Sequence, residues 1–191
     1  MGNHILVLYG SYRTDRKGIR LADFAVKRLR ARGENAELID AKAVGLPILD
    51  RMLKEYAPGT APVAMETLGA KIRAADAFLF VAGEYNWGVQ PGLKNLTDHF
   101  LEEWFWRPAA IACYSAGPFG GVRAAMQLRA LLPELGMPSI PSILALPKAQ
   151  DLFDEAGQPK ADWVAGQAGR FLDELEWYAN ALKAARAGGV P

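Results

Sequence analysis

A short basic stretch near the start of the chain holds the residues best suited to binding an anion. Ser11, Arg13 and Arg16 lie between the apolar run 5–8 and a helical pattern that begins after Gly18. The first turn of a helix leaves backbone N–H groups unpaired and carries the positive end of the helix dipole, so it attracts a negative group. A hydroxyl and two guanidinium groups at that place favour a phosphate. The alternative is a polar turn whose arginines are simply solvated.

The stretch matches neither of two common phosphate-binding motifs. No Gly-Lys-Ser/Thr follows, as a Walker loop requires, and Tyr12 stands where the dinucleotide fingerprint needs its second glycine. We therefore expect side chains as well as backbone to hold the phosphate.

Two further polar loops follow apolar runs and differ in character. Tyr85, Asn86 and Trp87 can border a flat ring through aromatic contact and amide hydrogen bonds. The glycine-rich segment 115–121 leaves room for backbone to approach such a ring closely. A phosphorylated planar cofactor would suit all three loops. Flavin mononucleotide (FMN) is the obvious candidate, although this chemistry alone does not choose it over another mononucleotide.

The loops are separated by alternating strand and helix patterns. Short apolar runs predict strands covered on both faces, and apolar residues at three- and four-residue spacing predict helices. Five alternations predict a doubly wound parallel sheet whose ligand lies outside the carboxyl ends of the strands. The expected strands are 5–8, 36–40, 77–82, 109–114 and 139–143, and the last is expected at an edge of the sheet because it contains Pro141. Five helices are expected between and after them. The first follows Gly18, the second begins at Val63, the third contains Leu93, Leu96 and Leu101, the fourth spans 122–135, and the fifth runs from about Val164 to Leu182.

Composition narrows the class of protein. The 191 residues fit one domain, and 22 Lys+Arg against 21 Asp+Glu provide no broad field for nucleic acid or an anionic membrane. No signal peptide or apolar run of about 20 residues is seen. A single cysteine, Cys113, excludes an internal disulfide and is expected to be an inert core thiol. We therefore expect a soluble cytoplasmic protein.

Four motifs together resemble one known family. In order and approximate spacing, from about residue 4 to about residue 155, they are similar to the NAD(P)H-dependent FMN reductases, which include many azo- and quinone reductases. The motifs are Gly10-Ser11-x-Arg13, Glu84-Tyr85-Asn86, Pro91-x-Leu93-Lys94-Asn95 and Ser115-x-Gly117-x-x-Gly120-Gly121-x-Arg123.

The resemblance implies a flavodoxin-like three-layer sandwich with strand order 2-1-3-4-5 and FMN at the switch point. Ser11 and Arg13 would bind its phosphate. Arg16 and Gly18 complete the expected phosphate site, although many family members have Ser and Asn at these positions.

The resemblance also implies which residues meet the isoalloxazine ring. Glu84, Tyr85 and Asn86 would line it, with Gly83 replacing the usual proline of this motif. Ser115 and Gly117 would close its other side. Trp87 and Gly120 complete the expected cofactor-binding set.

The implied activity is hydride transfer from NADH or NADPH to FMN and then to a quinone, azo compound, free flavin or metal complex. The cofactor would carry the chemistry, so no protein nucleophile, general base or metal is expected to be obligatory. The family resemblance further implies a homodimer or homotetramer.

Two other functions remain open at the level of sequence. A flavodoxin-like electron carrier would use a protein redox partner, but such carriers are usually strongly acidic and this chain has a formal charge of +1. A receiver-type signalling domain would need an acidic cluster at the strand ends, and Gly10-Ser11 offers none.

Overall fold

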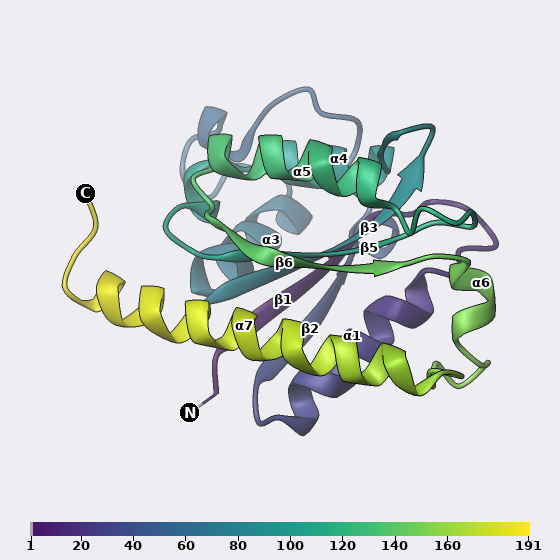
Figure 1. The fold of residues 1–191 in the computed structure, drawn as a ribbon. Helices are drawn as coiled ribbons and strands as arrows, with labels where there is room; N and C mark the ends of the chain where they lie inside the picture. Colours follow the sequence, from purple (N-terminus) through teal and green to yellow (C-terminus); the bar gives the residue numbers. More distant parts are fainter. Residues whose placement is uncertain (1) are drawn as a thin grey trace.

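A parallel sheet of five strands forms the centre of the computed structural model, which describes residues 2–191 (Figure 1). A short strand, β4, pairs antiparallel with β3 beside this sheet. With β4 left aside, the order β2-β1-β3-β5-β6 is the predicted 2-1-3-4-5 arrangement, so the flavodoxin-like α/β prediction is confirmed. The strands are β1 His4–Tyr9, β2 Asn35–Asp40, β3 Ala77–Tyr85, β4 Gly88–Val89, β5 Ala109–Tyr114 and β6 Ser139–Leu146.

The central strands read as continuous apolar runs because both of their faces are buried. Successive side chains of a strand point to opposite faces. In β1, Leu6 and Leu8 therefore join the core on one side of the sheet, whereas Ile5 and Val7 join the core on the other.

Helices cover both faces of the sheet (Figure 1). The first core packs beneath α3 (Val63–Ala74), α4 (Pro91–Asp98) and α5 (Val122–Glu134). The second packs against α1 (Ile19–Ala31) and the long C-terminal α7 (Asp162–Ala187). Shorter elements complete the described chain: α2 Ala41–Val44, α6 Ala149–Leu152, and the 3-10 turns η1 Leu53–Glu55 and η2 Glu102–Trp104.

Several boundaries differ from the sequence prediction, and three of the differences have a clear structural cause. Strand β3 continues past Ala82 to Tyr85, because the chain turns back there as a hairpin with β4. Helix α4 ends at Asp98, before Leu101, because the chain turns to bury Phe100 and Trp104 in the core. Strand β6 is indeed at the sheet edge, but it runs on to Leu146 after a register shift near Pro141.

The topology brings the three polar loops to one edge. Strands β1, β3 and β5 are direct neighbours in the sheet, and the loops at 10–18, 86–87 and 115–121 follow their carboxyl ends. This edge therefore carries the candidate site. Separately, no helix within residues 2–191 combines the length and apolar character needed to cross a membrane.

Candidate functional site

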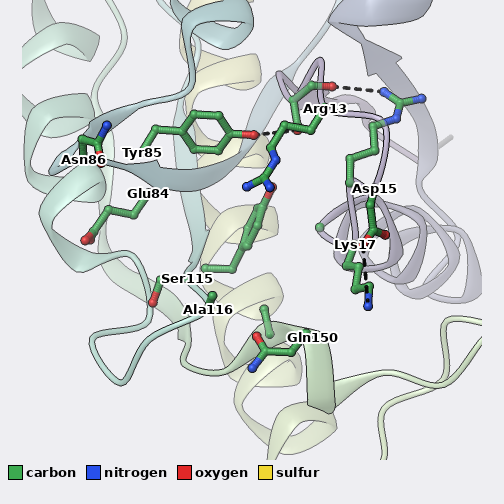
Figure 2. A pocket seen from close by; sticks show the side chains of 14 residues that line it. Arg13, Asp15, Lys17, Glu84, Tyr85, Asn86, Ser115, Ala116 and Gln150 are labelled. Carbon is green, nitrogen blue, oxygen red and sulfur yellow. Dashed lines mark hydrogen bonds and ion pairs between the residues drawn. The ribbon is translucent and has the colours of Figure 1, made fainter.

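A cavity of about 380 Å³ opens at the carboxyl ends of β1, β3 and β5. Figure 2 shows side chains converging on it from the loop after β1, from the hairpin after β3, from the loop after β5 and from α6. The lining residues are Ser11, Arg13, Asp15, Arg16, Lys17, Gly18, Glu84, Tyr85, Asn86, Tyr114, Ser115, Ala116, Ala149 and Gln150.

The loop after β1 presents unused hydrogen-bond donors to this cavity. Within residues 2–191, none of the backbone N–H groups from 11 to 18 donates to another backbone group. No carboxylate in the same described range pairs with Arg13, whose side chain lines the cavity. Unpaired amides beside an uncompensated guanidinium form a strong environment for an anion.

Arg16 has a different environment from Arg13. Its Nη1 lies 2.6 Å from Asp40 Oδ1 and donates to the carbonyl of Ser11 at 3.3 Å. The hydrogen bond with Asp40 raises the pKa of Arg16 above its ordinary value. Arg16 therefore lines the cavity while its charge is shared with Asp40, and it braces the loop from within.

A tight hairpin places the second group of residues. Asn86 and Trp87 have φ of 47° and 74°, and they connect the pairs Glu84–Val89 and Tyr85–Gly88. A two-residue turn with positive φ at both positions matches the twist of the flanking strands. The turn sets Glu84, Tyr85 and Asn86 along the cavity wall.

The Glu84 carboxylate is buried and paired. Its side chain is 4% exposed and forms an ion pair with the Arg123 guanidinium, while the Arg123 backbone N–H donates to Glu84 Oε2 at 3.3 Å. The same guanidinium lies 4.6 Å from the Trp87 ring centroid and 4.8 Å from that of Phe119. Glu84 thus fixes the hairpin to the start of α5.

The loop after β5 folds back on itself. Ser115 Oγ donates to the carbonyl of Gly117 at 3.0 Å, and the Lys148 N–H donates to the same carbonyl at 3.1 Å. The Ala149 N–H donates to the Ser115 carbonyl at 3.0 Å. These bonds bring the start of α6 to the cavity edge.

Tyr114 lines the cavity, and the buried Tyr9 lies behind it. Tyr114 accepts a hydrogen bond from Gln90 Nε2 at 2.8 Å, and its hydroxyl lies 3.4 Å from that of Tyr9. Burial raises the pKa of both phenols above the ordinary value. Both hydroxyls therefore keep their protons at neutral pH.

The structure brings together eight of the eleven residues expected from sequence. Those eight line the cavity: Ser11, Arg13, Arg16, Gly18, Glu84, Tyr85, Asn86 and Ser115. Trp87, Gly117 and Gly120 lie outside its lining, because Trp87 stacks on Arg123 and the two glycines shape the folded-back loop.

Sequence reasoning missed six of the 14 residues that line the cavity, among them Tyr114, Ala149 and Gln150. Tyr114 was treated only as the last residue of a strand, although a side chain at a strand's carboxyl end is well placed to reach a ligand. Ala149 and Gln150 come from a four-residue helix that has no periodic signal.

Comparison with known proteins identifies related sequences. The family model for NADPH-dependent FMN reductases matches residues 3–151. The NAD(P)H-dependent FMN reductase PA1204 of Pseudomonas aeruginosa is 36% identical over 157 residues, covering 79% of this chain and 82% of that protein. An NAD(P)H-dependent FMN reductase of Schizosaccharomyces pombe is 32% identical over 158 residues, which cover 77% of this chain and 74% of that protein. A quinone reductase of Pseudomonas putida is 33% identical over 119 residues, which cover 59% of this chain and 62% of that protein.

Solved structures share the fold. FerB, a flavoenzyme NAD(P)H:(acceptor) oxidoreductase from Paracoccus denitrificans, aligns with a TM-score of 0.74 and 22% identity, covering 92% of this chain and 98% of that one. A mutant flavodoxin from Pseudomonas aeruginosa aligns with a TM-score of 0.55 and 21% identity, and the alignment covers 88% of this chain and 99% of that one. These likenesses concern the fold, whereas the sequence match over residues 3–151 spans most of the chain. The chain therefore belongs to the NADPH-dependent FMN reductase family.

Proposed function

We propose that this protein binds FMN in the cavity at the carboxyl ends of β1, β3 and β5 and uses NADH or NADPH to reduce a small acceptor. One observation carries the proposal: Arg13 and a run of backbone amides, without partners among residues 2–191, share a cavity with the Glu84-Tyr85-Asn86 hairpin. An anion site beside a wall of aromatic and amide groups fits a phosphorylated planar cofactor.

The residues present fit FMN at both ends. Ser11, Arg13 and the amides of residues 11–18 would hold the phosphate, with Arg16 bracing the loop and Gly18 closing it. Tyr85 and Asn86 would border the ring from the hairpin.

The remaining predicted residues act around these contacts. Ser115 would close the other side of the ring, and Glu84 would hold the hairpin through Arg123. Trp87, Gly117 and Gly120 would support the site from outside its lining.

Bound FMN would supply the redox chemistry, accepting a hydride from the reduced nicotinamide and delivering it to the acceptor. The chain's own contribution is binding and orientation. The Ser11–Tyr85 contact joins the phosphate loop to the hairpin, so the two ends of the cofactor would be held in fixed relation. Glu84 has its charge matched by Arg123 and is not offered as a proton donor.

We propose a quinone as the principal acceptor, because relatives in two Pseudomonas putida strains are quinone reductases. Azo compounds, free flavin and metal complexes belong to the same proposal as further acceptors. Steady-state oxidation of NADPH and NADH by the FMN-loaded protein, with each acceptor in turn, tests it. Turnover with a quinone supports the reductase; an FMN-loaded protein that oxidises neither nucleotide, with any acceptor, is instead an electron carrier.

We also propose a cytoplasmic homodimer or homotetramer. Exposed apolar side chains gather along the start of α5 and the nearby hairpin, where Trp87, Phe119 and Met126 are each more than half exposed. Burying such a surface against a second copy would be favourable. Light scattering coupled to size-exclusion chromatography tests this, and a mass of 20.8 kDa would contradict it.

A further inference from the structure

One tyrosine ring fills the space beside two glycines in the candidate site. A Cβ atom added at Gly18 would lie 2.1 Å from Tyr114 Cζ and 2.2 Å from its hydroxyl oxygen. A Cβ added at Gly83 would lie 2.7 Å from the same two atoms. Contacts this short are impossible, so any side chain at position 18 or 83 requires the Tyr114 ring to move.

Backbone conformation does not explain the glycine at position 18. Gly18 has φ of −63° and ψ of −13°, a helical conformation that any residue adopts. The Tyr114 ring is therefore the feature that restricts this position to glycine.

Gly18, Gly83 and Tyr114 form one linked feature, because a single ring occupies the space next to both glycines. The Tyr114 hydroxyl stands where a side chain at position 18 would begin.

The hydrogen of this hydroxyl has no strong acceptor in the described structure. Gln90 Nε2 donates to the Tyr114 oxygen at 2.8 Å, which leaves the phenolic hydrogen to be donated elsewhere. Tyr114 donates this hydrogen to the Tyr9 oxygen at 3.4 Å, a distance longer than that of an ordinary O–H···O bond. Burial keeps the phenol protonated, since it raises the pKa of Tyr114.

We propose that Tyr114 is a specificity-determining residue that donates its hydroxyl hydrogen to the phosphate of the bound cofactor, beside Ser11 and Arg13. It supplies the donor that glycine at position 18 cannot. This inference rests on the proposed function, because it assumes that the cavity holds the phosphate of FMN.

The test compares FMN with riboflavin, which lacks the phosphate, in titrations of the wild type and Tyr114→Phe. A hydrogen bond to a charged group is strong enough that the variant should bind FMN about 10- to 100-fold more weakly. Riboflavin affinity should change less than about 2-fold, since the ring is kept. Equal weakening of both ligands would show that the hydroxyl acts only through Gln90 and would overturn the assignment, as would unchanged FMN affinity.

Ligand binding by the wild type distinguishes a failure of the proposed FMN site from a failure of the Tyr114 assignment. Binding of neither ligand by the wild type would overturn the proposed function together with this assignment. Normal FMN binding by both proteins would overturn the assignment alone.

A second measurement, made without any ligand, tests whether the Tyr114 ring is what restricts position 18 to glycine. Gly18→Ala should lower the melting temperature in the wild type, because its Cβ meets the Tyr114 ring. In the Tyr114→Ala background the same change should be neutral or stabilising, since alanine favours the helical conformation at position 18. An equal loss in both backgrounds would overturn the linkage.

Discussion

The Ser11 hydroxyl lies 2.9 Å from the phenolic oxygen of Tyr85, joining the loop after β1 to the hairpin after β3. Ser11 is 1% exposed, so this partner satisfies a buried group. Figure 2 shows the Tyr85 side chain reaching across the cavity toward the loop that carries Arg13. The contact couples the expected phosphate end of the site to its expected ring end.

Tyr85→Phe removes this contact while keeping the ring. Loss of one neutral hydrogen bond should weaken FMN binding about 2- to 10-fold, because the loop is less firmly fixed. Isothermal titration with FMN measures the change. An affinity equal to the wild type would show that the Ser11–Tyr85 contact does not organise the site.

Arg13→Ala tests the anion site itself. A charge-assisted hydrogen bond contributes about 1.5–3 kcal/mol, so the FMN dissociation constant should rise about 10- to 100-fold. Riboflavin binding should change little. Lys27→Ala is the matched control, since it also removes one positive charge but lies on the outer side of α1 near Ala156. Equal effects of the two changes would mean that only net charge matters.

Arg123→Ala should destabilise the fold near the hairpin. It leaves the Glu84 carboxylate buried without its partner, a change that costs several kcal/mol for fully buried pairs. The Arg123 side chain is 33% exposed, so water would soften the loss to about 2 kcal/mol.

Urea denaturation measures this loss. The double variant Arg123→Ala with Glu84→Gln removes the unpaired charge and should recover part of the stability. A double variant less stable than Arg123→Ala alone would contradict the ion-pair account.

Cys113 should make the free energy of unfolding depend on pH. Burial raises the pKa of its thiol from 9.0 to about 12, so the folded protein holds this proton more tightly than the unfolded chain. The free energy of unfolding should therefore fall as the pH rises above about 9. Tyr9 and Tyr114 have raised pKa values as well, but their ordinary value is 10.0, so Cys113 dominates between pH 9 and 10.

Chemical denaturation across this pH range measures the free energy of unfolding and tests this prediction. The Cys113→Ala variant should show a smaller decline than the wild type. Native protein should also react slowly with thiol reagents at pH 8, because the thiol is buried and protonated. Rapid labelling without denaturant would contradict this description.

The elements that sequence predicted best are those set by local pattern. The run Ile5–Leu8 and the run Ala109–Tyr114 are strands because each has both faces buried, which removes the polar alternation of a half-exposed strand. The loops after β1 and β5 were therefore placed correctly, and with them Ser11 and Arg13, whereas Glu84 and Tyr85 belong to strand β3 and not to a loop after it.

The parts that sequence missed depend on tertiary contacts. The pairing of Arg16 with Asp40 was not foreseen, because Asp40 comes close only through the pairing of β1 with β2. Tyr114 reaches the cavity because Gly18 and Gly83, far apart in sequence, both leave room for its ring. Helix α6 forms where the chain bonds back to Ser115, and no periodicity marks it.

The most direct test of the central claim is an absorbance spectrum of the purified protein after FMN loading and desalting, followed by anaerobic addition of NADPH and then of NADH to a fresh sample. We predict retained flavin absorption that bleaches with at least one nucleotide, at a rate that ranks the two donors. Retained absorption that neither nucleotide bleaches would contradict the reductase and point to an electron carrier, and protein that retains no flavin would contradict the FMN site itself.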